Sequence, residues 1–593
     1  WSVTGVQTCA LPIWAALPWM ILLTAKAART RSWRPAAQFA IVVALVGSVN
    51  ATALVLAGLG PIIWLLADVM SRRVRPTAAI AGAARIGLLS AAVSVWWIVA
   101  LRIQGTYGIP ILRYTETYQA VAGASTPAEL IRGLGYWFFY GGDRLDTWVG
   151  PSLPYLDNPA LIGLGFVIAA MGLLGFLTSF VGRASSAGLL LVGLAVSAGA
   201  APLDRSTPYG VVFGWFAEDT TAGLALRSTP RALPLVILAL ALGLGSSSEW
   251  ARTHVRRRVP GRFDLLVPAA LVGLLAVQLF PWFTGAALTP SILRDEQLPA
   301  HETELASWLD RSDSGTDGLV YELPAADFAN YRWGGTIDPV LPGLIDRPYL
   351  ARELVPQGSA ATADLLNAFE RRLPEGWFEP EALPDFARQF GAETIVLRNQ
   401  LEHERYRLAR PGMLWTDVTS VLGDPDHAGP TVTDTPQIPV LDERTLAHPD
   451  AADEFPAVAA FDLGTNETLT AASSTSPLVL AGSGDGVVDL AGAGLLDGRR
   501  PLLHASTLDD LAASDRLDPA MVGPETWWVF SDTNRKQGRH WSTVSSNLGA
   551  LEAAGPLSLD DDAGDNRLDV FSPTVGHQTV AVHEADVSDV RAS

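Results

Sequence analysis

Residues 37–69 read AQFAIVVALVGSVNATALVLAGLGPIIWLLADV, and Asp68 is the only charged residue among them. A single helix of this length would be about 50 Å long at 1.5 Å per residue, too long for a bilayer core of about 30 Å. The run Gly47–Asn50 near the middle therefore predicts a turn between two shorter helices, with Asn50 capping it. This stretch predicts a polytopic helical membrane domain.

Basic clusters at residues 26–34 and 72–75 flank this stretch. Loops rich in Lys and Arg lie on the cytoplasmic side of membrane proteins, so both ends of the stretch are predicted inside. A third basic cluster at residues 252–262 falls on the same side once the remaining spans are placed. Those spans are expected at residues 83–101, 161–181, 187–201, 233–244 and 265–283.

This topology leaves residues 103–159 as a first outer loop. Its centre reads GYWFFYGGDRLDTW over residues 135–148, where five consecutive rings precede two carboxylates around one guanidinium. Rings with polar edges favour the membrane–water interface. Upstream, residues 126–129 read TPAE and predict a helix start, with Thr126 as N-cap and Glu129 reaching back to it. The helix is then expected to lie on the bilayer with one apolar face formed by Leu130, Leu134, Trp137 and Phe138.

Two interpretations of the first loop remain open: an interfacial anchor with a surface ion pair, or a loop that faces a ligand. The second outer loop, residues 204–231, poses the same choice. It contains Glu218 and Asp219 and ends in the sequence RSTPR at residues 227–231. Its two arginines, four apart at the start of a span, either bind a ligand or extend to the lipid headgroups.

The charge of −19 over 593 residues hides two opposite halves. Residues 1–285 carry 21 Lys and Arg against 11 Asp and Glu, which leaves 21 against 50 for the remainder. The acidic half, which follows the last span, is predicted to be extracytoplasmic. Its charge argues against nucleic acid as a partner, because binding nucleic acid requires basic residues that neutralise phosphates.

Helical and strand patterns alternate in this acidic half, which predicts an α/β region. Pro, Asp and Thr dominate residues 424–453, so we expect one domain at 286–425 and a second α/β unit at 426–593. The expected strands are residues 318–323, 393–397, 476–481, 501–505 and 527–530, and the expected helices are residues 302–310, 362–372, 381–390 and 487–496.

Signals for cofactors and metals are weak. The glycine loop at residues 482–486 lacks the last glycine of G-x-G-x-x-G, where Val487 stands, so a plain βα turn is the expected structure. The acidic run at residues 560–569 either holds calcium or is a solvated turn. We predict no cofactor and no catalytic metal. Residues 1–13, which include the only cysteine, Cys9, resemble translated sequencing adaptor and are expected to contribute no element of the fold.

Four stretches carry a resemblance to a known family. They read RYTETY at residues 113–118, RGLGYWFFYGGDRL at 132–145, LRSTPRA at 226–232 and DPVLPGLIDRPY at 338–349. Together they resemble the large α-(1→3)-arabinofuranosyltransferases that branch cell-wall arabinan in mycolic-acid bacteria. The resemblance spans most of residues 14–593.

The resemblance implies a membrane domain of the GT-C class at residues 14–285, followed by the extracytoplasmic α/β region. It implies a plasma-membrane enzyme that transfers arabinofuranose from a polyprenyl-phosphate donor to an arabinan acceptor. The general base of that class is a carboxylate in the first outer loop of the whole enzyme, which is expected before Trp14, so no catalytic residue is assigned here. Residues 590–593 resemble the start of a carbohydrate-binding domain, so the chain is expected to be a fragment cut at both ends. The fragment is expected to be inactive alone, because its base is expected before Trp14.

Transfer from a lipid phosphate requires cations that hold the departing phosphate. Guanidinium groups bind phosphate bidentately, and the candidates in or beside the outer loops are Arg113, Arg144, Arg227 and Arg231. The carboxylates that could bind sugar hydroxyls are Glu116, Asp143, Asp146, Glu218 and Asp219. Trp137, within the rings of residues 136–140, could stack on sugar or polyprenyl.

Two other functions stay possible at this stage. One is a membrane-anchored scaffold that binds polysaccharide without catalysis. The other is a lipid-sugar translocator, which would carry ionisable residues at mid-membrane depth. The expected spans are nearly free of charge, with Asp68 at an end, and this argues against transport.

Overall fold

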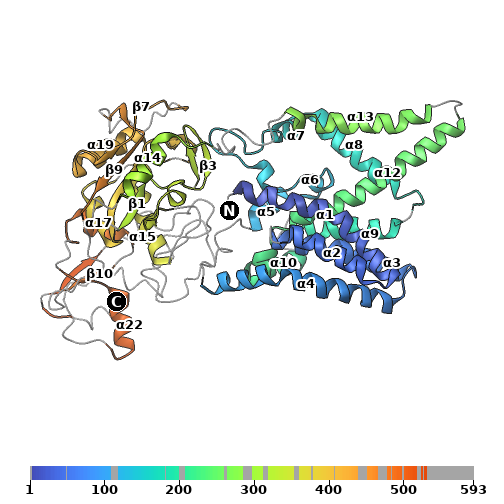
Figure 1. Cartoon of the computed structure of the whole chain (residues 1–593), viewed down its shortest axis with the longest axis horizontal. Helices are drawn as coiled ribbons and strands as arrows, with labels where there is room; N and C mark the ends of the chain where they lie inside the picture. The colour runs from blue at the N-terminus through green and yellow to red at the C-terminus, as the bar shows by residue number, and fades with distance from the viewer. Residues whose placement is uncertain are drawn as a thin grey trace. The chain divides into compact units, whose positions relative to one another are not determined.

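The computed structural model describes two compact units, a helical unit up to Thr284 and an α/β unit from Gln297 onward (Figure 1). The described residues are 3–47, 50–107, 118–180, 182–199, 208–258, 263–284, 297–311, 318–326, 328–352, 360–375, 378–406, 408–438, 451–464, 477–481, 484–496, 500–516, 522–524 and 526–530.

The helical unit is built almost wholly of helices. Within its described residues, four are long and apolar enough to cross a membrane, over Ala51–Met70, Pro76–Thr106, Thr229–Arg258 and Phe263–Phe283. The main helices are α1 (Val3–Thr30), α2 (Trp33–Val46), α3 (Ala51–Met70), α4 (Pro76–Tyr107), α8 (Pro159–Gly175), α9 (Arg183–Ser197), α12 (Leu233–Arg258) and α13 (Leu266–Leu279). The connecting elements are α5 (Tyr118–Ala124), α6 (Pro127–Ile131), η2 (Trp137–Tyr140), α7 (Ser152–Asp157), α10 (Pro208–Asp219), α11 (Thr221–Leu226), η3 (Thr229–Ala232), η4 (Phe263–Leu265) and η5 (Phe280–Thr284).

The predicted turn between two helices in residues 37–69 is confirmed. Helix α2 ends at Val46, and Asn50 is the N-cap of α3, where its Oδ1 accepts a hydrogen bond from Ala53 N at 2.9 Å. Near the far end of α3, Asp68 is buried and pairs with Arg29 at 2.9 Å. The buried charge therefore sits at a helix end and is compensated there.

Helix α1 begins at Val3, inside the stretch that we expected to contribute no element. Ile13 is fully buried and packs in a hydrophobic cluster with α2 and α3 residues. The expectation that residues 1–13 lie outside the fold is therefore wrong for the end of this stretch. Apolar residues continue across Ile13 into the rest of α1, which explains why the helix includes them.

One hydrophobic cluster joins α1, α3, α9 and α12, with Leu17, Leu56, Leu189 and Leu235 among its members. Helix α12 also packs closely on α8, where a Cβ at Gly175 would clash with the carbonyl oxygen of Gly243. Small residues allow such close backbone contact between membrane helices. The packing of the unit thus centres on α12.

The α/β unit contains two main sheets. The first has strand order β4-β1-β5-β9-β6, in which β1 is parallel to both β4 and β5, and β9 is antiparallel to β5. The second has order β11-β10-β12 and is parallel. The strands are β1 (Leu319–Leu323), β2 (Ala329–Tyr331), β3 (Gly334–Ile337), β4 (Tyr349–Leu350), β5 (Ala392–Arg398), β6 (His427–Ala428), β7 (Thr431–Thr433), β8 (Glu454–Pro456), β9 (Val458–Asp462), β10 (Leu478–Ala481), β11 (Leu502–His504) and β12 (Trp527–Phe530).

The four helices predicted from the sequence in this unit are found as α14, α15, α17 and α21, and the other helices were not predicted. Apolar runs bounded by polar residues identified β1, β5, β10, β11 and β12 as strands, and all five are confirmed. The helices of the unit, including one short 3₁₀ turn, are α14 (Ala300–Leu309), η8 (Leu341–Gly343), α15 (Ala360–Glu370), α16 (Arg372–Glu375), α17 (Ala382–Gln389), α18 (His403–Tyr406), α19 (Pro411–Leu422), α21 (Gly484–Gly492) and α22 (Ala505–Ala513).

The expected boundary between residues 425 and 426 does not separate the two sheets. Strands β6 and β9 lie beyond it, yet they belong to the first sheet. Helix α21, which follows β10, packs in the same core as β1 and β5, since Val487 and Leu490 share a cluster with Tyr321 and Ile395. The two parts form one compact unit.

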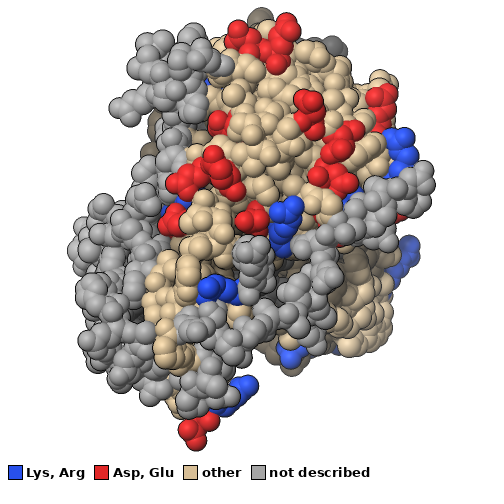
Figure 2. Space-filling model, turned by 90° about the vertical axis from the view of Figure 1, so that its left-hand side faces the viewer, with Lys and Arg blue, Asp and Glu red and all other residues tan. Residues whose placement is uncertain are grey.

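Figure 2 shows one face of the molecule on the side of the α/β unit, where acidic side chains are spread between apolar and neutral ones and basic side chains are fewer. This agrees with the acidic composition of the second half of the sequence. A surface of this charge repels polyanions. The exclusion of nucleic acid stays a prediction.

Candidate functional site

Both predicted outer loops rest on the same hydrophobic cluster of the helical unit. Leu130 of α6 is fully buried in it, together with Ala232 and Leu233 at the start of α12. Gly133 also lies against α12, because a Cβ there would be 3.0 Å from Ile237 Cδ1. The two loops therefore meet at the N-terminal end of α12.

A network of three polar side chains organises the first loop. Arg132 Nη1 donates to Glu129 Oε1 at 2.7 Å, and the Tyr140 hydroxyl donates to Glu129 Oε2 at 2.8 Å. The predicted capping box is wrong: Thr126 is the N-cap of α6, but its hydroxyl makes no capping hydrogen bond within this described segment. Glu129 instead bonds to Arg132 and to Tyr140 of η2, so each oxygen of its carboxylate accepts a hydrogen bond there.

Arg132 connects this network to the helices behind it. Its Nη2 donates to the carbonyl oxygen of Tyr155 at 2.7 Å, and its guanidinium lies 5.5 Å from the centre of the Phe166 ring. The hydroxyl of Tyr155 in turn donates to the carbonyl oxygen of Gln278 in α13. The Arg132 side chain is only 4% exposed, so its role here is to hold α6 to α7 and α8.

Burial, followed by the hydrogen bond and the negative charge of Glu129, raises the pKa of Tyr140 well above its ordinary value. The phenol therefore stays protonated at all physiological pH values and acts as a hydrogen-bond donor. Burial likewise raises the pKa of Tyr155. Neither group can serve as a general base near neutral pH.

The predicted continuous helix through Trp137 and Phe138 is wrong. Helix α6 ends at Ile131, and the rings form a separate 3₁₀ turn, η2. Gly133 and Gly135 have φ angles of +84° and +105°, in the left-handed region that glycine adopts most readily, and they end the helix.

The rings of η2 pack on one another and on the following hairpin. Trp137 contacts Phe138 and Trp148 edge to face, at 5.9 and 6.0 Å between ring centres, and Phe138 lies 5.0 Å from Trp148. Phe138 is almost completely buried, and Phe139 stacks on Trp282 near the end of the last span. Most of these rings thus form a core for the loop, and Trp137 is partly exposed at its edge.

The charged residues after the rings form a tight hairpin. Gly142 and Thr147 pair as an isolated bridge, and Asp143 Oδ1 accepts hydrogen bonds from the backbone N–H groups of Leu145 and Asp146 at 2.9 and 3.0 Å. Asp143 therefore fixes the turn through one carboxylate oxygen. Arg144 and Asp146 are the exposed charged side chains at its tip.

The second loop presents its arginines differently. Arg227 follows α11 and is only 7% exposed, next to the buried Ser228, while Arg231 in η3 is half-buried. The Thr229 hydroxyl donates to the carbonyl oxygen of Ser197 at 3.2 Å, which ties the loop to α9. The burial of Arg227 argues against the interpretation in which it extends to lipid headgroups.

The remaining candidates are placed only in part. Asp219 is exposed at the end of α10, and Glu218 is in the same helix, with its side chain outside the description. Arg113 and Glu116 lie outside the described residues. Within the described residues, no group of three or more His, Cys, Asp or Glu side chains could hold a metal ion.

Sequence reasoning missed Glu129, Arg132 and Tyr140 as one unit. The spacing of three between Glu129 and Arg132 is a signal for an ion pair on a helix, but we read Glu129 as a cap. The contact with Tyr140 depends on the two glycine turns between them, and helical periodicity gives no hint of it.

The sequence matches, over residues 2–569, a family described as Alpha-(1->3)-arabinofuranosyltransferase, N-terminal GT-C domain. The Alpha-(1->3)-arabinofuranosyltransferase of Mycobacterium tuberculosis (strain ATCC 25618 / H37Rv) is 29% identical over 452 residues, which are 72% of this chain and 30% of that protein. Its namesake in Mycolicibacterium smegmatis (strain ATCC 700084 / mc(2)155) is 28% identical over 426 residues, 69% of this chain and 29% of that protein. The chain thus spans about 30% of the length of these curated relatives.

The fold also matches solved structures. The cryo-EM structure of arabinofuranosyltransferase AftD from Mycobacteria superposes with a TM-score of 0.63 at 23% identity, over 90% of this chain and 35% of that chain. A mutant of the same protein gives a TM-score of 0.62 at 22% identity, over 91% and 37%. The predicted fold class, a polytopic helical membrane domain of GT-C type followed by an α/β region, is confirmed.

Proposed function

We propose a function from one established premise: the chain belongs to the family of the N-terminal GT-C domain of α-(1→3)-arabinofuranosyltransferases, as its loop motifs predicted. The proposal is that it forms part of a membrane glycosyltransferase that transfers arabinofuranose to cell-wall arabinan and forms α-(1→3) branches. Relatives with this activity in their names, and apolar helices that suit a membrane, support it.

The proposed donor is a polyprenyl phosphate that carries arabinofuranose. The observation that carries this proposal is the convergence of the two loops at the N-terminal end of α12, where Leu130 and Ala232 share one cluster. A lipid donor keeps its chain in the bilayer and its phosphate at the interface, so it requires cations on loops that end membrane helices. Arg144 is exposed at a hairpin tip, and Arg227 and Arg231 belong to the loop that leads into α12.

The roles proposed for the other candidates follow from their placement. Asp146 and Asp219 are exposed carboxylates and are suited to bind sugar hydroxyls, whereas Asp143 mainly shapes the hairpin. Trp137 is partly exposed and is suited to contact the donor with its ring. Glu218, Arg113 and Glu116 stay candidates from the sequence alone.

We also propose that the basic loops face the cytoplasm and that the α/β unit is extracytoplasmic, in the plasma membrane. The one-sided distribution of Lys and Arg supports this orientation. We keep residues 14–285 as the membrane part of the enzyme, with outer loops at 103–159 and 204–231.

The test is a transfer assay with the full-length enzyme and a radiolabelled arabinofuranosyl polyprenyl phosphate, followed by linkage analysis of the product. We expect new α-(1→3) linkages with the lipid donor and none with a nucleotide-linked arabinose. Residues 14–593 alone serve as the control and are expected to be inactive, because the family resemblance puts the general base before Trp14. A full-length protein that binds arabinan but transfers no sugar would favour the scaffold function instead.

A further inference from the structure

The carboxyl ends of β1 and β5 mark a special place in the first sheet. These neighbouring parallel strands are connected in opposite directions: the chain leaves β1 for β4 on one side and returns to β5 on the other. They therefore flank a topological switch point, and open α/β sheets bind ligands there, outside the carboxyl ends of their strands.

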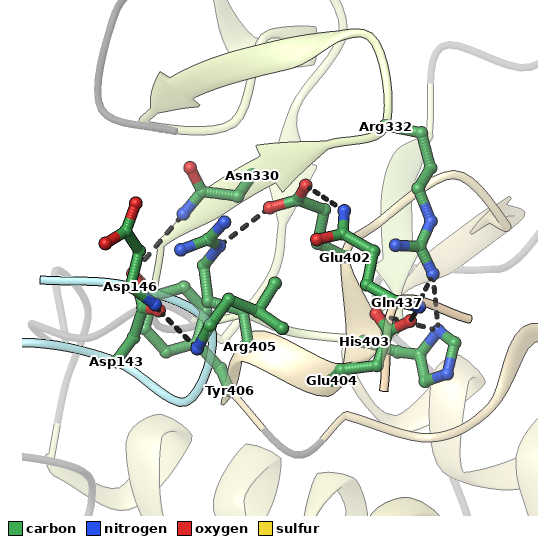
Figure 3. A network of polar contacts seen from close by, with 11 residues as sticks. Asp143, Asp146, Asn330, Arg332, Glu402, His403, Glu404, Arg405, Tyr406 and Gln437 are labelled. Atoms are coloured by element: carbon green, nitrogen blue, oxygen red, sulfur yellow. Dashed lines mark hydrogen bonds and ion pairs between the residues drawn. The ribbon is translucent and has the colours of Figure 1, made fainter. Parts of the chain in front are cut away.

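Two segments that follow these strands lie together at this edge (Figure 3). One is the hairpin β2–β3, and the other is residues 398–404. Arg332 N donates to the carbonyl oxygen of Gln400 at 2.7 Å, and Glu402 N donates to that of Asn330 at 2.8 Å. We call the polar side chains that these segments bring together the switch-point cluster, and its members are Arg332, Trp333, Arg398, Asn399, Gln400 and Glu404.

An ion pair with unused hydrogen-bonding capacity lies at the centre of the cluster. Arg332 Nη2 donates to Glu404 Oε1 at 2.8 Å, and Gln437 N donates to the same oxygen at 2.6 Å. Arg332 Nη1 and Glu404 Oε2 are buried and have no hydrogen-bond partner among the described residues, although His403 Nδ1 lies 3.6 Å from Glu404 Oε2. A donor and an acceptor thus remain unused beside one another.

The other members add two donors and two acceptors of the same kind. Arg398 Nη2 and Trp333 Nε1 are buried donors, and Asn399 Oδ1 and Gln400 Oε1 are buried acceptors, all without a partner in the part of the chain that the structure describes. Native proteins leave few buried polar atoms unpaired, because each one costs free energy. Six such atoms on two adjoining segments indicate a place that a bound molecule completes.

Burial and exposure are arranged as a ligand site requires. Arg398, Asn399 and Glu404 are at least nine-tenths buried, so their positions are fixed. The side chain of Arg332 is 21% exposed, and Trp333 and Gln400 are partly exposed, so solvent reaches part of the cluster.

Charge and shape narrow the class of ligand. Arg398 is compensated by the carboxylates of Glu302 and Glu322, and Arg332 by Glu404, so the cluster offers no excess positive charge for an anion. The cluster offers three donors and three acceptors, as suits hydroxyl groups, which both donate and accept. Trp333 stacks on Tyr331 at 4.6 Å between ring centres, which places a flat aromatic pair beside them.

We propose that the switch-point cluster binds a neutral carbohydrate chain. The identification of that chain as arabinan, the acceptor, rests on the proposed function. The α/β unit then holds the polymer independently of the membrane loops that act on the donor.

Two substitutions test the cluster with little risk to folding. Trp333→Phe removes the Nε1–H group and keeps a stacked ring, and Gln400→Met removes the amide and keeps the shape. Because Trp333 Nε1 and Gln400 Oε1 lack hydrogen-bond partners among the described residues, the melting temperature should stay unchanged or rise. Calorimetric titration of the detergent-solubilised chain with a synthetic arabinofuranose oligosaccharide, without lipid donor, should show binding that each variant weakens about tenfold.

Trp308→Phe is the matched control, since Trp308 lies on α14, stacks on His427 and is not a member of the cluster. It should bind like the wild type. The inference is overturned if the wild-type chain binds no oligosaccharide, if both cluster variants bind as tightly as the wild type, or if a polyanionic glycan binds more tightly than the neutral one. Lost transfer in the full-length enzyme with intact binding would count against the proposed function alone, and intact transfer without binding would count against this inference alone.

Discussion

Arg132 and Arg144 lie twelve residues apart in one loop and differ in almost every physical respect. Arg132 is buried and bonds to Glu129 and to the backbone of α7, whereas Arg144 is exposed at the hairpin tip. Sequence reasoning selected Arg144, because a guanidinium between two carboxylates stands out in the sequence. It passed over Arg132, because burial depends on the surrounding helices, which the local sequence does not reveal.

Replacing Arg132 by Met should destabilise the first loop. It leaves the Glu129 carboxylate, itself 22% exposed, with only the Tyr140 hydroxyl, and removing one partner of a mostly buried pair costs about 3 kcal/mol. Hydrogen exchange of the backbone amides in residues 126–140 should become faster and the melting temperature should fall. Glu249→Gln, which breaks an exposed ion pair with Arg252, is the control and should change neither. Equal hydrogen-exchange rates of residues 126–140 in both variants would contradict this role of Arg132.

A second prediction at this scale concerns pH. Burial raises the pKa of Glu370 from 4.5 to about 7, although hydrogen bonds from Ala325 N–H and the Tyr321 hydroxyl, together with the charge of Arg352, lower it. The folded state therefore keeps a proton that the unfolded chain releases above pH 4.5. The contribution of Glu370 to the free energy of unfolding is therefore greatest below about pH 4.5 and falls by about 3 kcal/mol as the pH rises to 7.

Unfolding of the α/β unit at pH 4.5 and pH 7.5, followed by tryptophan fluorescence, measures this change. Glu370→Gln should lose most of the difference between the two pH values, because the amide does not ionise. If wild type and variant show the same pH dependence, Glu370 is not the group that titrates.

At the scale of elements, the sequence predicts best where a pattern is local. Five of the twelve strands described in the α/β unit were predicted because each is a short apolar run between polar residues, and β5 is buried along its whole length. The prediction of one helix across residues 130–138 was wrong, although the apolar residues there have helical spacing. Two glycines at positive φ outweigh that spacing, since they allow the loop to fold back so that Tyr140 reaches Glu129.

Gly135→Ala should therefore disturb the loop. The added Cβ would lie 2.7 Å from Leu130 Cδ2. The backbone would also hold alanine at a φ of +105°, a conformation that costs a non-glycine residue of order 1–3 kcal/mol. Gly123→Ala is the matched control: it lies in α5, and a Cβ there would meet no described atom within 4 Å. The melting temperature should fall in the first variant and stay level or rise in the second. An unchanged melting temperature in both variants would show that a side chain at residue 135 does not strain the turn.

At the scale of the molecule, the sequence established two regions of opposite charge and composition, and the structure divides into two units. The predicted domain boundary at residue 425 was wrong, because β9 pairs with β5 although it lies about sixty residues further along the chain. Pairing at such separation leaves no local trace, whereas a Pro- and Asp-rich stretch suggests a linker whether or not the sheet continues beyond it.

Topology is the property of the whole molecule that the account most depends on. We expect Ser307→Cys on α14 to react with an impermeant thiol reagent in intact cells, and Thr253→Cys near the end of α12 to react only after permeabilisation, both in a Cys9→Ser background. The reason is that Thr253 lies among the basic residues that end α12. The reverse labelling pattern would refute the orientation.

The central claim is that the outer loops hold the phosphate of the donor, and Arg144→Ala in the full-length enzyme tests it most directly. Arabinosyl transfer from the polyprenyl-phosphate donor should fall about a hundredfold, the effect of losing one group that stabilises transition-state charge. Expression and melting temperature should be nearly unchanged, because the side chain is exposed. Arg258→Ala, at the basic end of α12, should transfer at the wild-type rate. Near-normal transfer by Arg144→Ala would contradict the claim and would leave the loop an interfacial anchor.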